Sequence, residues 1–350
     1  MHDTARLKLE IMSRGIVVGH QARDVLAAAS PAGLTDADYP TTSGLTLVLP
    51  GGVYVNAPVD EWYCDDPAAE LVWSPQMSSF LLRAGRADVK VRALPLPGYL
   101  AMGDRTFESV RTHADRVRVS PISGCACRCS FCDLNLADYQ RHDVSTMVRA
   151  VQSALDDSYL PGRHVLISGG TPRPEDRDWL DAAYVALIEA SPVPVDVMLM
   201  PRATTEVIDM LVAAGVDGLS INLELLGDVA AKHYCPQKAA VGLDGYAAAI
   251  RRAVELTGGS GRVRSLLLVG LEEPAATLAG VELIASLGAD PVLSPFRPAE
   301  GTATACLRPP SADVMEELHA SAMEIAKRYG VALGPRCVPC MHNTLTFPAG

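Results

Sequence analysis

Short apolar runs alternate with amphipathic segments between residues 117 and 329 of this 350-residue chain, and this alternation constrains its fold more than any other feature. The runs are mostly apolar along their whole length, as strands buried on both faces are. They span residues 117–122, 164–168, 195–200, 219–223, 263–269 and 291–296. Between and after these runs, apolar residues recur at the spacing of an amphipathic helix, in residues 146–155, 175–190, 204–214, 245–256, 274–287 and 312–329. Six such β–α units predict parallel strands joined by right-handed crossovers.

Helix-end signals agree with these boundaries. Gly215, Gly288 and Gly330 stand just after three helical segments, where a left-handed cap is needed, and Ser311 is well placed as the N-cap of the last one. A full (β/α)8 barrel needs two more units, so we expect a partial (β/α)6 barrel of the TIM type over residues 116–330. Ligands of such folds bind at the carboxyl ends of the strands.

The remaining residues have another pattern. Short apolar runs at 44–49, 53–56, 79–82 and 89–94, a turn at residues 50–52 and an early helix near 22–29 predict a β-rich or α+β extension over residues 1–115. A structural cap or dimer surface is the favoured interpretation of this extension, and a substrate lid is the alternative. Residues 331–350 form a C-terminal tail.

Composition indicates a cytoplasmic enzyme. The net charge of −11, from 30 basic and 41 acidic residues, argues against a nucleic-acid partner. The longest apolar stretches, such as residues 266–271, are far too short to span a membrane, and the N-terminus lacks an apolar signal core. Nine cysteines, an odd number, suit a reducing compartment in which thiolates serve as ligands.

Four of these cysteines lie within residues 125–132. Cys125, Cys129 and Cys132 have the spacing C-x3-C-x2-C, with Phe131 just before the last. Structural zinc prefers four ligands in two pairs, and a disulfide knot suits a small secreted domain. An iron–sulfur cube normally takes four protein ligands, so a set of three leaves one iron open. Cys127 is interpreted as a bystander.

This motif resembles the signature of the radical S-adenosylmethionine (SAM) superfamily, whose core is a six-unit partial barrel. The motif style is most similar to that of biotin synthase and lipoyl synthase. The resemblance implies that the three cysteines hold a [4Fe–4S] cluster, that SAM binds its open iron, and that an electron donor such as flavodoxin or ferredoxin reduces it. Reductive cleavage of SAM then gives a 5′-deoxyadenosyl radical, which takes hydrogen from the substrate.

The ends of the second, fourth and fifth strands carry the SAM-site candidates. Two glycines after the second strand let the backbone approach a ligand closely. The resemblance implies that they stand at the superfamily's GGE motif, whose backbone holds the SAM amino group, and that Thr171 replaces its glutamate. Polar residues alternate on one face of the fourth strand, where they form either a hydrogen-bonded network or part of a SAM site similar to that of lipoyl synthases. The fifth strand matches the superfamily's GxIxGxxE motif in part. The polar face of the fourth strand is formed by Ser220, Asn222 and Glu224. The SAM-site candidates are Ser168, Gly169, Gly170, Thr171, Asn222, Glu224, Gly270 and Glu273.

Arg202 and Arg297, after the third and sixth strands, are candidate anchors for a small polar substrate. In the tail, Cys337 and Cys340 predict either a second [4Fe–4S] cluster over the open face of the barrel, or a turn with buried thiols or a zinc site. The third ligand of that cluster is expected to be Cys306, then Cys64, then His342.

Three hypotheses for the function remain open. One is sulfur insertion by a radical SAM enzyme, with the second cluster as sulfur donor. Another is a radical carbon-skeleton change, dehydrogenation or epimerisation, with the second cluster in electron transfer. The third is a non-catalytic zinc or iron–sulfur binding module.

Overall fold

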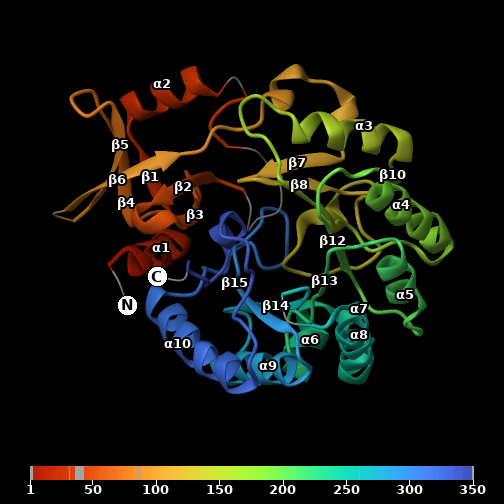
Figure 1. Ribbon diagram of the computed structural model, residues 1–350. Helices are drawn as coiled ribbons and strands as arrows, with labels where there is room; N and C mark the ends of the chain where they lie inside the picture. The colour runs from red at the N-terminus through yellow and green to blue at the C-terminus, as the bar shows by residue number, and fades with distance from the viewer. Residues whose placement is uncertain (1–2, 31, 36–42, 86, 260, 349–350) are drawn as a thin grey trace.

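A curved sheet of seven strands organises the larger part of the molecule (Figure 1). The computed structural model describes residues 3–30, 32–35, 43–85, 87–259 and 261–348. Six strands run parallel in chain order: β8 (Arg116–Val119), β11 (His164–Ile167), β12 (Val195–Leu199), β13 (Gly218–Ile221), β14 (Val263–Val269) and β15 (Asp290–Pro295). β7 (Val110–His113) is antiparallel to β8. β15 forms one edge of the sheet and β7 forms the opposite edge.

Helices follow the parallel strands and cover the outer face of this sheet (Figure 1). They are α3 (Val144–Leu155), α4 (Arg177–Ala190), α5 (Glu206–Ala213), α8 (Gly242–Thr257), α9 (Pro274–Ser286) and α10 (Ala312–Tyr329). Ser311 accepts a hydrogen bond from the Val314 N–H, and Gly215, Gly288 and Gly330 have φ values of 91°, 82° and 70°. The predicted partial barrel of six β–α units is confirmed, with its caps.

Two short helices that the sequence analysis did not predict follow β13. They are α6 (Asp228–Tyr234) and α7 (Pro236–Ala239), and they pack against each other. Two further unpredicted elements are β9 (Ile122–Ser123) and β10 (Gln140–Arg141), which pair antiparallel on either side of the cysteine loop. These four elements are too short to show a hydrophobic period.

The N-terminal part is an α+β unit built on a second sheet. Its strand order is β1 (Ile16–Val18), β4 (Ala69–Ser74), β5 (Ser79–Ala84), β6 (Ala87–Ala93), β2 (Leu45–Leu49) and β3 (Val53–Ala57). β1 and β4 are parallel and the other pairs are antiparallel. α2 (His20–Ala29) contacts β4, and α1 (Asp3–Arg14), which was not predicted, contacts β3. One hydrophobic core runs through both sheets.

The C-terminal tail joins the two parts. The Leu345 N–H donates to the Leu293 carbonyl of β15, and the buried Lys8 ammonium donates to the carbonyls of Met341 and Thr346, at 2.7 Å each. The tail therefore extends the free edge of the barrel sheet and lies under α1. No helix among the described residues is long and apolar enough to cross a membrane.

Candidate active site

The cysteine loop lies at the carboxyl end of β8. It leaves β9 at Gly124, whose φ of 71° is left-handed, and it ends at Cys132, where a short 3-10 helix begins. The Asn135 side-chain amide donates to the carbonyls of Cys129 and Cys132, at 3.0 and 2.7 Å. These bonds hold the backbone from Cys129 to Cys132 in one conformation, and they therefore fix the positions of the two thiols relative to each other.

A cavity of about 250 Å³ runs through the inside of the half-barrel, next to this loop. At the carboxyl ends of the strands it is lined by Cys125, Cys127, Cys129, Phe131, Cys132, Ser168, Gly169, Thr171, Asn222, Glu224, Phe296 and Arg297. At the amino ends it is lined by Arg116 and Arg264, and by Pro335 and Cys340 of the tail. Most of the predicted site residues therefore meet around one space.

The three cysteines of the motif differ in their surroundings. The Cys125 sulfur faces the Cys127 thiol and accepts backbone N–H bonds from Thr171, at 3.1 Å, and Cys127, at 3.3 Å; these partners lower the pKa of Cys125. Burial raises the pKa of Cys129 and of Cys132 to about 12. Metal binding deprotonates thiols of this kind, because the ion supplies positive charge. Three thiols that line one end of the cavity are the donor type that holds a [4Fe–4S] cluster, so the donor set fits one.

The glycine pair after β11 packs directly on the cysteine loop. The Ala126 N–H donates to the Thr171 carbonyl at 3.0 Å. A Cβ atom on Gly170 would collide with the carbonyl oxygen of Gly124. Gly169 has a φ of 145°, a backbone angle that residues other than glycine rarely adopt. Gly170 therefore lets the two loops meet, whereas the resemblance assigned the pair only to backbone contact with SAM.

The polar face of the fourth strand is both hydrogen-bonded and open to the cavity. The Ser220 hydroxyl donates to the Asn222 side-chain oxygen at 2.8 Å, and all three predicted residues of this face are buried. Glu224, in a left-handed conformation with a φ of 68°, pairs with the Lys238 ammonium at 2.5 Å. Asn222, Glu224 and Lys238 line the cavity. The two interpretations offered by the sequence thus describe the same residues.

Lys238 is a residue that sequence reasoning missed. It lies on α7 and reaches the carboxyl ends of the strands. Burial by itself lowers the pKa of Lys238, but the Glu224 carboxylate, together with Tyr246 and Cys129, raises that pKa well above its ordinary value. The pair therefore places an ammonium and a carboxylate beside the cysteines. The signal that could have found Lys238 is the need of the buried Glu224 for a cationic partner.

Gly270 and Glu273 are not among the residues that line the cavity. Gly270, with a φ of 104°, faces Pro310, and Glu273 is exposed at the start of α9. Its half-buried neighbour Glu272 accepts the Gly227 N–H at 2.8 Å. From the fifth strand, Leu266 and Leu268 reach the cavity.

The two predicted arginines differ in their surroundings. Arg202 makes two bonds to the Asp181 carboxylate of α4, at 2.7 and 2.6 Å, so its guanidinium is already occupied. Arg297 is buried, lines the cavity and donates to the Tyr63 hydroxyl at 3.3 Å. Three further arginines line the cavity without having been predicted: Arg116, Arg118 and Arg264.

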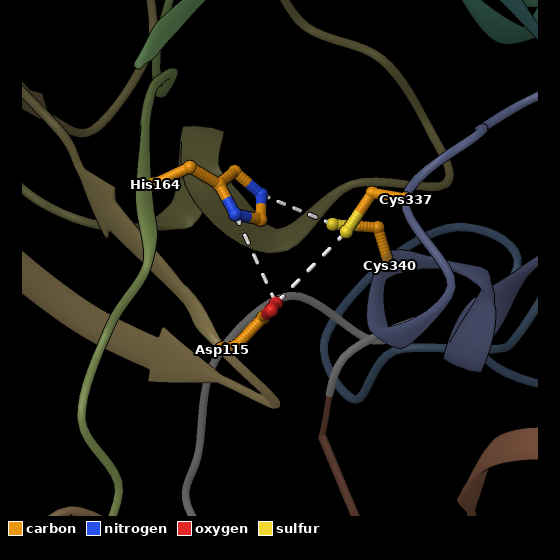
Figure 2. Close-up of side chains that lie close together, drawn as sticks. All are labelled: Asp115, His164, Cys337 and Cys340. Atoms are coloured by element: carbon orange, nitrogen blue, oxygen red, sulfur yellow. Dashed lines mark hydrogen bonds and ion pairs between the residues drawn. The ribbon is translucent and has the colours of Figure 1, made fainter. Parts of the chain in front are cut away.

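The tail cysteines lie at the amino ends of the barrel strands, so their predicted position over the open face is wrong. Cys337 and Cys340 meet Asp115, just before β8, and His164, the first residue of β11 (Figure 2). The tail reaches this end because it pairs with β15, which brings Gly334 beside Val292.

None of the three expected partners of the tail cysteines belongs to this group. Cys306 is exposed, Cys64 lies against Gly15 in the N-terminal unit, and the buried His342 ring faces His113 with 6.3 Å between ring centroids. Asp115 and His164 take the place that the sequence analysis gave to these residues.

No protein-family model matches the sequence, and no curated protein matches it. Solved structures match its fold. A radical SAM methyltransferase from Sphaerobacter thermophilus is 17% identical over 79% of this chain and 80% of its own, with a TM-score of 0.51. SuiB from Streptococcus suis, bound to precursor peptide SuiA, is 15% identical over 69% of this chain and 53% of its own, with a TM-score of 0.50. Methylornithine synthase (PylB) is 17% identical over 61% of this chain and 62% of its own, with a TM-score of 0.49.

The matched region is only part of some of these proteins: it spans 62% of methylornithine synthase and 52% of the hydrogenase maturase HydG from Carboxydothermus hydrogenoformans. At such low identity the similarity concerns the fold. It agrees with the partial barrel of six parallel strands. In its fold, the chain is similar to a solved radical S-adenosylmethionine methyltransferase, an enzyme of the superfamily whose signature its three-cysteine motif resembles.

Proposed function

We propose that this protein is a radical SAM enzyme that cleaves SAM reductively and abstracts a hydrogen atom from a small anionic metabolite. The observation that carries the proposal is that Cys125, Cys129 and Cys132 line one cavity at the carboxyl ends of the barrel strands. When bound there, a [4Fe–4S] cluster supplies the low-potential electron for SAM cleavage. Flavodoxin or ferredoxin is the proposed source of that electron.

The chain's own residues suit the methionyl end of SAM. That end carries one ammonium and one carboxylate group, and the Glu224–Lys238 pair offers the opposite charges at the cavity wall. The backbone at Ser168, Gly169 and Thr171 faces the same space. We propose that these groups orient SAM beside the cysteines. Enclosure within the half-barrel would keep water away from the reacting atoms.

The substrate class follows from the charge of the cavity. Arg116, Arg118 and Arg264 line it, together with Arg297. The Asp196 carboxylate lies 2.8 Å from Arg264 and offsets part of this charge. The Arg116 and Arg297 guanidinium groups suit a carboxylate or phosphate, which accepts their paired N–H donors.

The decisive experiment is a SAM cleavage assay. The full chain, reconstituted anaerobically with iron and sulfide, should produce methionine and 5′-deoxyadenosine from SAM when dithionite is added. Adding a deuterated metabolite extract should place deuterium in the 5′-deoxyadenosine if an abstractable substrate is present. An iron-loaded protein that makes no 5′-deoxyadenosine would favour the alternative, a non-catalytic binding module.

Lys238→Met should weaken SAM binding about tenfold or more, because a charged hydrogen bond contributes about 1.5–3 kcal/mol. Calorimetric titration of SAM into anaerobic, cluster-loaded protein measures this effect. Lys238→Arg should recover most of the affinity because it keeps the charge. The control is Lys232→Met, since Lys232 is exposed on α6 and pairs with Asp228. Equal affinities in Lys238→Met and Lys232→Met would exclude a role for Lys238 in SAM binding.

Among the radical reactions, we favour a carbon-skeleton change, dehydrogenation or epimerisation over sulfur insertion. Sulfur insertion needs an auxiliary cluster as sulfur donor, and Cys337 and Cys340 were its predicted ligands. The donors gathered around these two cysteines include a histidine and an aspartate, which suit a different metal. Sulfide and iron counts therefore bear on the reaction as well as on the tail.

A further inference from the structure

We propose that Asp115, His164, Cys337 and Cys340 form a closed site for one zinc ion that fastens the C-terminal tail to the amino end of the barrel. This inference is independent of the proposed function. One ligand atom from each residue lies within 4.8 Å of all the others. Figure 2 shows the four side chains turned toward a common centre.

The distances suit a single ion. The His164 Nε2 atom lies 3.2 Å from the Cys340 sulfur, and the Asp115 Oδ1 atom lies 3.9 Å from the Cys337 sulfur. His164 would bind the ion through one ring nitrogen, and its other nitrogen, Nδ1, lies 3.8 Å from Asp115 Oδ1. Tetrahedral zinc holds nitrogen, oxygen and sulfur ligands at about 2.0–2.3 Å, which places them roughly 3–4 Å from one another. A four-iron cube binds each ligand to a different iron and needs a wider spacing.

The ligand types favour zinc as well. Two cysteines, one histidine and one carboxylate are all zinc ligands, whereas iron–sulfur cubes are held mainly by thiolates. Four protein ligands leave no open position, which is typical of a structural rather than a catalytic zinc.

Charge at the site also suits a metal bound to thiolates. Two thiolates and one carboxylate around Zn²⁺ leave one net negative charge. Arg116 lies near Cys340, and Arg264 interacts with both cysteines. These guanidinium groups would stabilise the loaded site.

The fold explains how such distant residues meet. In the pairing of β8 with β11, Arg116 lies opposite His164, so Asp115 and His164 stand together at the amino end of the sheet. The tail then supplies Cys337 and Cys340 from the other side. Because Pro335 and Cys340 line the cavity, a zinc ion here would fix the cavity floor.

Metal analysis of the anaerobically purified full chain tests this inference. We expect about one zinc and about four irons per chain. Cys337→Ser/Cys340→Ser should lose the zinc and keep the iron, and Asp115→Asn should bind zinc more weakly. The triple alanine variant of Cys125, Cys129 and Cys132 should lose iron and keep zinc. Cys306→Ser is the matched control, since that exposed cysteine lies outside the group.

Two further measurements report on the site without enzyme activity. Co²⁺ in place of zinc should give thiolate charge-transfer bands that disappear in Cys337→Ser/Cys340→Ser. Zinc should slow amide hydrogen exchange in residues 335–345 of the wild type only. About eight irons with no zinc would overturn the proposal in favour of a second cluster. A Cys337–Cys340 disulfide without metal, or zinc retained by the double serine variant, would overturn it too.

Discussion

Alanine in place of Cys125, Cys129 or Cys132 should abolish SAM cleavage. Each of these thiols lines the cavity, and a cluster with one protein ligand missing is not held at this site. The same variants should lose most of their iron after anaerobic reconstitution, although their barrel remains folded. Production of 5′-deoxyadenosine under dithionite, normalised to folded protein by circular dichroism, measures the effect.

Cys127→Ala is the matched control. Its sulfur lies 3.9 Å from the Met200 sulfur and its thiol faces Cys125, so its loss should alter the packing and the pKa of Cys125 but leave three ligands in place. We expect retained iron and retained SAM cleavage. An inactive Cys127→Ala together with an active variant of any other cysteine of the loop would show that the ligand assignment is wrong.

Gly170→Ala should impair the cluster loop even though the change adds one methyl group. Its Cβ would collide with the Gly124 carbonyl, next to Cys125, and backbone atoms yield less readily than a flexible side chain. Overpacking of this kind costs about 1–3 kcal/mol. If the cysteine loop shifts to relieve the collision, SAM cleavage should fall about tenfold or more. Iron content and the cleavage assay together measure the result.

Gly245→Ala is the control for this prediction. It adds the same methyl group on α8, where the new Cβ would meet a methyl carbon of Val241, which belongs to a side chain. We expect normal iron content and activity. If Gly170→Ala behaves like Gly245→Ala, the close contact between the glycine loop and the cysteine loop is not needed for cluster binding.

Local patterns in the sequence were sufficient to predict the barrel and to place the cysteine motif at the carboxyl ends of its strands. β14 and α10 have the predicted bounds, because a buried strand and an amphipathic helix each show their burial as a period in the sequence. The three cysteines are close in the chain, so their spacing already limits how their thiols can meet. Elements that lack a long period, such as α7, were missed, and Lys238 was missed with them.

Only the tertiary structure decided which end of the barrel the tail reaches. A CxxC pair carries no information about its distant partners, and Asp115 and His164 are ordinary residues in the sequence. Their meeting with the tail depends on two long-range pairings, β8 with β11 and the tail with β15. The sequence by itself thus determined the barrel and its three-cysteine motif, because those depend on neighbours in the chain. Packing between remote segments determined the Glu224–Lys238 pair, the contact at Gly170 and the four-residue group at the cavity floor.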